Sequence, residues 1–221
     1  MATTPEHQLT VRLDLAKEWL QTKLSKTRLT HSIGACEKAL ELAKKFNLPA
    51  EHKDWMCEQA AFAGLLHDAA KLMSPEDLLF YCDSHQIPLA PDDRESPQTL
   101  HPFVGAEMVR RELGIQDETI LNAIRFHTTG RADMSLVEKI VFVADKIEGN
   151  TRNPLFVRKA TEQLNFTKPE SLDHTLLFLL ESTIRFVMDK QQVIHPRTLE
   201  ARNSIIRNLK QNQSPHAYRN R

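Results

Sequence analysis

The chain of 221 residues is poor in glycine and has no net charge. Its 6 glycines are well below the roughly 7% that average proteins contain, which argues against a turn-rich all-β fold. The 29 basic and 29 acidic side chains cancel, so no overall positive field attracts nucleic acid or an anionic membrane. We therefore expect an all-α protein that has neither nucleic acid nor a membrane as a partner.

Cysteine is also scarce, and long apolar runs are missing. Cys36, Cys57 and Cys82 are widely spaced and form no Cys-x-x-Cys pair, which disfavours a disulfide framework and a structural zinc knuckle. The first twenty residues hold no apolar stretch of signal-peptide length, and no run approaches the roughly 18–20 apolar residues of a membrane span. These features predict a cytoplasmic protein.

Apolar residues recur at helical spacing through most of the chain. This periodicity predicts a first amphipathic helix over 8–26 and a second from Ser32 to Phe46, beginning near His31. The run from Ala60 is apolar on every side until His67 and Asp68, so we expect a helix through the middle of a bundle. The other predicted helices cover 78–84, 101–113, 117–127, 135–147, 155–164 and 172–187, and a last one opens at His195-Pro196. Residues 85–99 are expected to form the longest loop.

Histidine and acidic side chains interrupt the apolar runs at a few points, which are His31, His67-Asp68, His101, His127 and Asp145. An ionised carboxylate on an apolar helix is costly to bury unless it is paired or bound to a cation. Asp145 has Arg125, Lys139 and Lys146 as ordinary candidate partners, and a lone histidine is more often a plain core or surface residue. Taken together, the imidazoles and acids favour one or two first-row divalent ions, with iron expected first and manganese or another such ion as the alternative.

Several familiar catalytic motifs are missing from the sequence. It contains no G-x-S-x-G elbow, no G-x-x-x-x-G-K-[ST] phosphate loop and no G-x-G-x-x-G dinucleotide fingerprint. A metal ion makes a protein nucleophile unnecessary, because it lowers the pKa of a coordinated water from 15.7 toward about 7. We therefore expect hydrolysis by an activated water.

Several segments resemble one known family. The order H…HD…D, centred on Leu65-Leu66-His67-Asp68-Ala69-Ala70-Lys71, resembles that of the HD-domain metal-dependent phosphohydrolases. More narrowly, the chain resembles the YqeK-type symmetrical bis(5'-nucleosyl)-tetraphosphatases over roughly residues 28–205. The segments that carry this resemblance are Arg28-x-x-His31-Ser32, His67-Asp68-x-x-Lys71, His101-Pro102-x-x-Gly105-Ala106, Ile124-Arg125-x-His127-Thr128-x-Gly130, Lys139-Ile140-x-x-x-Ala144-Asp145-x-Ile147-Glu148 and His195-Pro196-x-Thr198-x-x-x-Arg202-Asn203.

The resemblance implies a domain organisation and a set of metal ligands. It implies an HD-type helical domain over 28–205, with residues 1–27 as an added N-terminal helix and 206–221 as a C-terminal tail. His31, His67, Asp68 and Asp145 match the family's metal ligands, and a second ion would involve His101 and His127. Arg152 follows Asp145 one residue farther along the chain than the family's arginine does.

The resemblance also implies a substrate, which is diadenosine tetraphosphate cleaved symmetrically to two ADP. The implied catalytic residues are Asp68, Lys71, His101 and His127. The implied substrate contacts are His31, Asp68, Lys71, His101, His127, Thr128, Arg152, Thr198 and Arg202. Two alternatives stay open, another HD-type hydrolase of nucleoside mono- or triphosphates and a non-catalytic nucleotide-sensing module. A homodimer is compatible with each of them.

Overall fold

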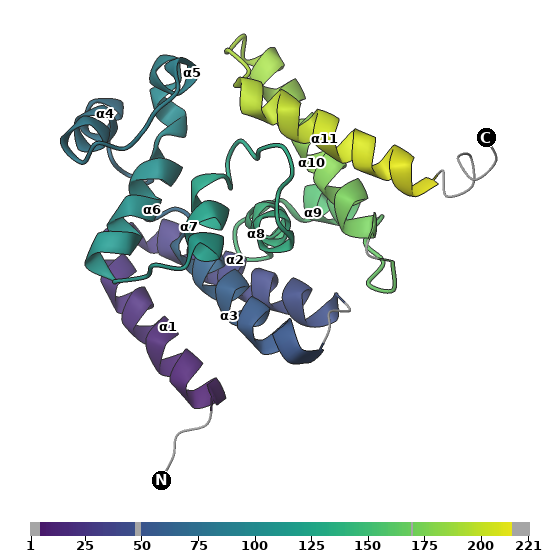
Figure 1. Cartoon of the computed structure of the whole chain (residues 1–221), viewed down its shortest axis with the longest axis horizontal. Helices are drawn as coiled ribbons and strands as arrows, with labels where there is room; N and C mark the ends of the chain where they lie inside the picture. The colour runs from purple at the N-terminus through teal and green to yellow at the C-terminus, as the bar shows by residue number, and fades with distance from the viewer. Residues whose placement is uncertain (1–4, 47–49, 169, 214–221) are drawn as a thin grey trace, which may run out of the picture.

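The computed structural model describes residues 5–46, 50–168 and 170–213. In this part of the chain there are eleven α-helices, one short 3-10 helix and no strand (Figure 1). This confirms the all-α prediction. None of the described helices is both long enough and apolar enough to cross a membrane.

The first three helices form one side of the bundle. α1 spans Pro5–Gln21, α2 spans Lys26–Lys45 and α3 spans Ala50–Leu66. The predicted helix over 8–26 was wrong at its end, because a turn follows Gln21. The predicted start of the second helix was also wrong: α2 begins at Lys26, where the Ser25 hydroxyl accepts a hydrogen bond from the Arg28 N–H at 3.3 Å and caps the helix.

His67 and Asp68 lie in a turn and not within a helix, which corrects the prediction for this run. The apolar pattern continues through Ala69 and Ala70, but α3 ends at Leu66. The reason is local: the His67 ring donates from Nδ1 to the Gly64 carbonyl at 2.8 Å, and that carbonyl would otherwise receive the next helical hydrogen bond. The turn places both side chains at the end of a rigid helix.

The remaining helices complete the bundle and a C-terminal pair. They are α4 (Pro75–Ser84), α5 (Pro91–Glu95), the 3-10 helix η1 (Pro97–Thr99), α6 (His101–Glu112), α7 (Glu118–Arg125), α8 (Leu136–Ile147), α9 (Pro154–Thr161), α10 (Glu170–Asp189) and α11 (Pro196–Gln213). The predicted longest loop therefore contains α5 and η1. α11 runs past the expected domain end at 205, and residues 214–221 of the expected tail lie outside the described residues.

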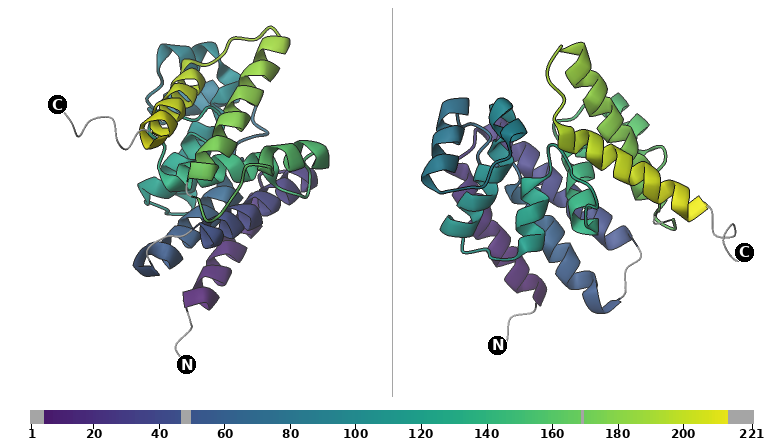
Figure 2. Two further views of the ribbon diagram at one scale, coloured as in Figure 1. Left: turned by 90° about the vertical axis from the view of Figure 1, so that its right-hand side faces the viewer. Right: turned by 45° about the horizontal axis from the view of Figure 1, so that its top comes forward.

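α8 is the centre of the molecule. A capping box of Ser135 and Glu138 starts it, and it packs against α2, α3, α7 and α10. α1 and α11 lie on opposite sides of this centre (Figures 1 and 2). α1 buries Ala16 and Leu20 in the same apolar core as α8, while a second, smaller core lies beneath α4 and α6. The separate domain status of residues 28–205 stays a prediction.

Candidate metal centre

Six of the predicted site residues meet near the N-terminus of α6 and the C-terminus of α7. They are His31 from α2, His67 and Asp68 from the turn after α3, His101 at the start of α6, His127 just after α7, and Asp145 from α8. All six side chains are buried. Two sets of three place their ligand atoms within 4.8 Å of one another: His31, His67 and Asp145, and His67, Asp68 and His127. His67 belongs to both sets.

The first set is the more compact. His31 Nε2 lies 3.0 Å from Asp145 Oδ1 and 3.2 Å from His67 Nε2. His67 Nε2 lies 3.6 Å from the same Asp145 oxygen. A single cation placed among these three atoms would touch all of them, since nitrogen and oxygen ligands bind first-row ions at about 2.0–2.2 Å.

Asp68 joins the two sets through its two oxygens. Its Oδ2 lies 3.6 Å from His67 Nε2, and its Oδ1 lies 3.4 Å from His101 Nε2 and 3.5 Å from His127 Nε2. The His101 and His127 nitrogens are 3.4 Å apart. Asp68 therefore lies between His67 on one side and His101 and His127 on the other.

The far side of three of the imidazoles is fixed by the fold. His67 donates from Nδ1 to the Gly64 carbonyl at 2.8 Å, and His127 donates from Nδ1 to the Ile124 carbonyl at 2.8 Å. His31 Nδ1 lies 3.0 Å from Glu148 Oε1. Assigning the ring proton to Nδ1 in each case leaves a bare Nε2 facing the centre, which is the arrangement that metal-binding histidines normally show.

These ligand atoms suit a divalent ion because hydrogen-bond acceptors face one another. Burial lowers the pKa of His67 to about 4, so this ring is neutral at pH 7 and its Nε2 accepts hydrogen bonds. That nitrogen faces one oxygen of Asp68 and one of Asp145, which are acceptors as well. A cation bound by these acceptors removes the unfavourable contact, and in its absence the nearest group that can share a proton with them is the His31 ring, 3.2 Å from His67 Nε2.

Cationic side chains surround the two carboxylates. Burial by itself would raise the pKa of Asp145, but Lys146, His31 and Arg152 hold it well below the ordinary value. Lys146 Nζ lies 3.2 Å from Asp145 Oδ2, and Arg152 Nη2 lies 2.5 Å from Asp145 Oδ1. Burial alone would also raise the pKa of Asp68, but it too lies well below the ordinary value, and Arg28 Nη1 lies 3.1 Å from Asp68 Oδ2. Both acids are therefore ionised and ready to bind a cation.

Lys71 and Thr128, two of the predicted substrate contacts, lie at the edge of this centre. Lys71 Nζ lies 3.1 Å from His101 Nε2 and 3.9 Å from Asp68 Oδ1. Thr128 Oγ1 lies 3.0 Å from His127 Nε2 and 3.4 Å from His101 Nε2. The Lys71 ammonium and the Thr128 hydroxyl thus lie beside the second set of ligands.

The other predicted substrate contacts divide into two groups. Arg152 lies at the centre, where its Nη2 is 3.4 Å from His31 Nε2 as well as close to Asp145. Thr198 and Arg202 are both on α11, where Thr198 is buried and Arg202 forms an ion pair with Glu181 of α10 at 2.8 Å. Their predicted role around an ADP moiety stays a prediction.

Sequence reasoning did not include Arg28 and Glu148 among the site residues, and it named Lys146 only as a possible partner of Asp145. Arg28 Nη1 lies 3.1 Å from Asp68 Oδ2, and Lys146 Nζ contacts Asp145 and the His127 carbonyl. Glu148 is fully buried, orients His31, and accepts hydrogen bonds from the Asn150 and Thr151 N–H groups at 2.6 and 3.1 Å. Arg28 and Glu148 stand in segments that resemble the family, so the signal was present. Of the other candidate partners of Asp145, Arg125 bonds to Asn122 and Lys139 pairs with Asp173.

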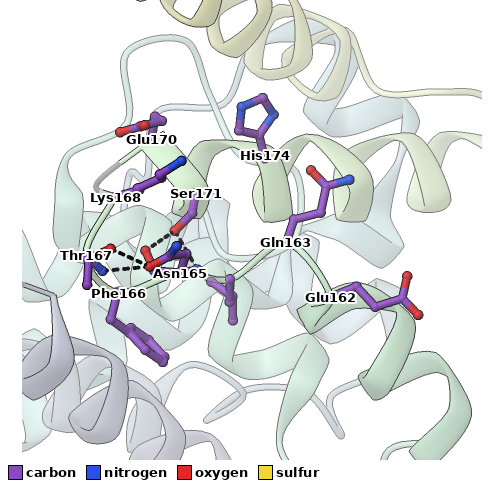
Figure 3. Close-up of a pocket in the computed structure, with 10 residues that line it drawn as sticks. Glu162, Gln163, Asn165, Phe166, Thr167, Lys168, Glu170, Ser171 and His174 are labelled. Atoms are coloured by element: carbon purple, nitrogen blue, oxygen red, sulfur yellow. Dashed lines mark hydrogen bonds between the residues drawn. The ribbon is translucent and has the colours of Figure 1, made fainter.

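A surface cavity of about 730 Å³ lies between α9 and α10, but the candidate ligands take no part in it (Figure 3). Some of its polar groups bond to one another: the Asn165 side chain accepts hydrogen bonds from Thr167, and the Ser171 hydroxyl donates to the Asn165 carbonyl at 2.8 Å. None of the predicted site residues lines this cavity.

Comparisons with known proteins identify the family of the chain. The HD domain family model matches residues 28–150, more than half of the chain. Symmetrical bis(5'-nucleosyl)-tetraphosphatases from Halalkalibacterium halodurans and Bacillus subtilis are 34% and 32% identical to it, over 86% and 85% of this chain and 95% and 94% of theirs. The relative of the same name from Staphylococcus aureus is 31% identical over 87% of this chain and 94% of its own length.

A solved structure shows the same fold. The crystal structure of a predicted HD superfamily hydrolase involved in NAD metabolism from Clostridium acetobutylicum matches with a TM-score of 0.77 and 35% identity, over 89% of this chain and 97% of that one. Together with the sequence matches, this shows that the chain belongs to the HD-domain family and, within it, to the group of the symmetrical bis(5'-nucleosyl)-tetraphosphatases.

Proposed function

We propose that the protein is a metal-dependent hydrolase that cleaves diadenosine tetraphosphate symmetrically to two ADP. The observation that carries the proposal is the position of His67 Nε2, an acceptor nitrogen that faces one oxygen of Asp68 and one of Asp145 at 3.6 Å. Relatives that carry this activity in their names match the chain over nearly their whole length. The reaction consumes one water. It breaks the bond between the central bridging oxygen, which joins the two middle phosphorus atoms, and one of these two atoms.

The first ion would be held by His31, His67, Asp68 and Asp145, and a second, if present, by Asp68 together with His101 and His127. When bound, such ions acidify a coordinated water toward a pKa of about 7 and stabilise negative charge on phosphoryl oxygens. Glu148 keeps His31 in the tautomer that presents Nε2, since its carboxylate accepts the Nδ1 proton. The His31 ring is thereby oriented before substrate arrives.

Cationic side chains would bind the tetraphosphate. Lys71, Arg28 and Arg152 each lie within 3.9 Å of a site carboxylate, and the Lys71 and Arg152 side chains are 30% and 35% exposed. Partial exposure lets them reach phosphoryl oxygens that enter from solvent, where they would offset charge in an in-line displacement. Thr128 adds a hydroxyl donor beside His127.

Iron is the proposed metal, with manganese or another first-row ion as the alternative, because the ligands are only imidazoles and carboxylates. The small nucleotide is the proposed partner, and a homodimer is compatible with the fold. We propose a cytoplasmic location, since Cys36, Cys57 and Cys82 are all free thiols.

The test is product chromatography together with elemental analysis of anaerobically purified protein. We expect two ADP per diadenosine tetraphosphate and stoichiometric first-row metal. AMP with ATP would contradict symmetrical cleavage. Tight binding of the dinucleotide without ADP release would favour a sensing module, and faster turnover of nucleoside mono- or triphosphates would favour the broader HD activity.

A further inference from the structure

A second buried charged cluster lies outside the metal centre, where α5 meets the start of α11. Asp93 is fully buried, and its carboxylate accepts hydrogen bonds from Arg197 Nη1 and Nη2 at 2.5 and 2.6 Å. It also accepts from the Ala90 N–H at 2.8 Å and from His195 Nε2 at 3.1 Å. His195 Nε2 is the donor because its Nδ1 accepts the Arg197 N–H at 3.2 Å. We call Asp93, His195 and Arg197 the Asp93 cluster.

Arg197 connects this cluster to two aromatic rings. Its guanidinium carbon lies 5.1 Å from the centre of the Phe103 ring and 5.9 Å from that of Phe126. The two rings pack edge to face, with centres 6.1 Å apart. Because Asp93 holds both terminal nitrogens of Arg197, the guanidinium has a fixed position beside Phe103 and, together with the Arg131 guanidinium at 5.0 Å, beside Phe126.

The two rings are neighbours in sequence of two metal-centre imidazoles. Phe126 directly precedes His127, and Phe103 follows His101 by two residues on the first turn of α6. His101 and His127 are the residues whose Nε2 atoms approach Asp68 Oδ1 at 3.4 and 3.5 Å. His31 is held separately, through Glu148. The Asp93 cluster is therefore connected most directly to the segments that carry His101 and His127, whereas His31 lies on α2.

We propose that Arg197, fixed by Asp93, is a positioning residue that holds His101 and His127 in register through Phe103 and Phe126. Its effect on catalysis rests on the proposed function, whereas its effect on the two imidazoles does not. Loss of the Asp93–Arg197 contact frees the guanidinium, loosens the aromatic pair and lets the two histidines move relative to Asp68. Misplacement by about 1 Å can cost roughly 10²-fold in rate.

The kinetic test uses Arg197→Met and Asp93→Asn, with Arg197→Lys as the conservative variant. We expect kcat for diadenosine tetraphosphate to fall about 10- to 100-fold with KM within about twofold, because positioning and not substrate binding is lost. Arg197→Lys should retain an intermediate kcat, since lysine keeps the charge but not the two-pronged contact. The control is Arg94→Met on α5, the helix that carries Asp93. This substitution breaks the exposed 2.6 Å ion pair with Asp83 and should leave kcat unchanged.

A second readout works without metal and without substrate. The ¹⁵N spectra of the metal-free protein are recorded under conditions in which all variants are folded. Arg197→Met and Arg197→Lys should shift the His101 and His127 ring resonances and leave those of His31 in place. Equal shifts at all three rings, or none, would overturn the proposal, as would wild-type kcat in Arg197→Met. If the wild type releases no ADP, the proposed function fails while the spectra still decide the positioning role. If Asp93→Asn does not fold, the two Arg197 variants carry the test.

Discussion

The metal centre and the Asp93 cluster are two buried charged groups in one helical bundle, and they differ in how their polar atoms are matched. Every hydrogen bond to Asp93 comes from an N–H donor, so that cluster is complete within the protein. In the metal centre, His67 Nε2 faces oxygens of Asp68 and Asp145 at 3.6 Å, acceptor against acceptor. A mismatch of acceptors, and not the burial of charge alone, therefore indicates a cation site.

The largest expected effect is the loss of activity when a carboxylate of the metal centre is replaced. Asp68→Asn removes the proposed bridging carboxylate, and loss of several kcal/mol of metal stabilisation corresponds to a fall in kcat of at least about 10³-fold. Bound metal measured by elemental analysis should fall with it. A variant with wild-type metal content and turnover would show that Asp68 is only a structural acid.

The free energy of unfolding should rank the two clusters in the opposite order, with the larger loss in the Asp93 cluster. Asp93→Asn leaves Arg197 and His195 without their buried anion, and breaking such a pair costs about 3–5 kcal/mol of unfolding free energy. Asp68→Asn in the metal-free protein should cost less, because its partners Arg28 and Lys71 have side chains that are 39% and 30% exposed and regain water. Urea unfolding of both variants measures this, and an equal loss would remove the distinction.

Metal addition should stabilise only a protein with an intact centre. An ion present at 100 times its Kd contributes about 2.7 kcal/mol to the folded state. For a chain of this size that raises Tm by roughly 5–10 °C. Thermal melts with Mn²⁺ and with a chelator should show this shift in the wild type and in Arg94→Met, and lose it in Asp145→Asn. A shift of the same size in Asp145→Asn would place the ion elsewhere.

Acid should release the Asp93 cluster over a defined pH range. Burial alone would raise the pKa of Asp93, but Arg197, the Ala90 N–H and His195 together lower it. A lowered carboxyl pKa stabilises the fold above the unfolded value of about 3.9, and this stability is lost as the pH falls through the folded value. Between pH 5 and pH 2.5, Asp93→Asn should therefore lose less unfolding free energy than the wild type. Parallel curves would contradict the pairing.

Much of the fold follows from apolar periodicity, and the errors have local causes. α6, α7 and α8 lie close to their predicted ranges, because each has a continuous buried face, α6 has a proline in its first turn, and Asp117 and Ser135 cap α7 and α8. The start of α2 was placed too late because its first turn is mostly polar. His67 and Asp68 were placed in a helix because the apolar pattern does not reveal that the His67 ring takes the Gly64 carbonyl.

The metal centre was more predictable than the Asp93 cluster. An imidazole or carboxylate inside an apolar run is visible in one segment, so all six candidate ligands were named. Asp93 lies in a stretch rich in proline and acid that suggests a solvated loop, and its partner Arg197 is 104 residues away. Nothing in either segment alone indicates that contact, which depends on how α5 and α11 meet.

The most direct test of a cation at His67 is an anomalous difference map from crystals of anaerobically purified protein, recorded at the absorption edge of the metal found by elemental analysis. The account predicts a peak about 2.0–2.2 Å from His67 Nε2 that also touches a carboxylate oxygen of Asp68 or Asp145. A fully loaded crystal whose only peaks lie away from His67 would contradict it.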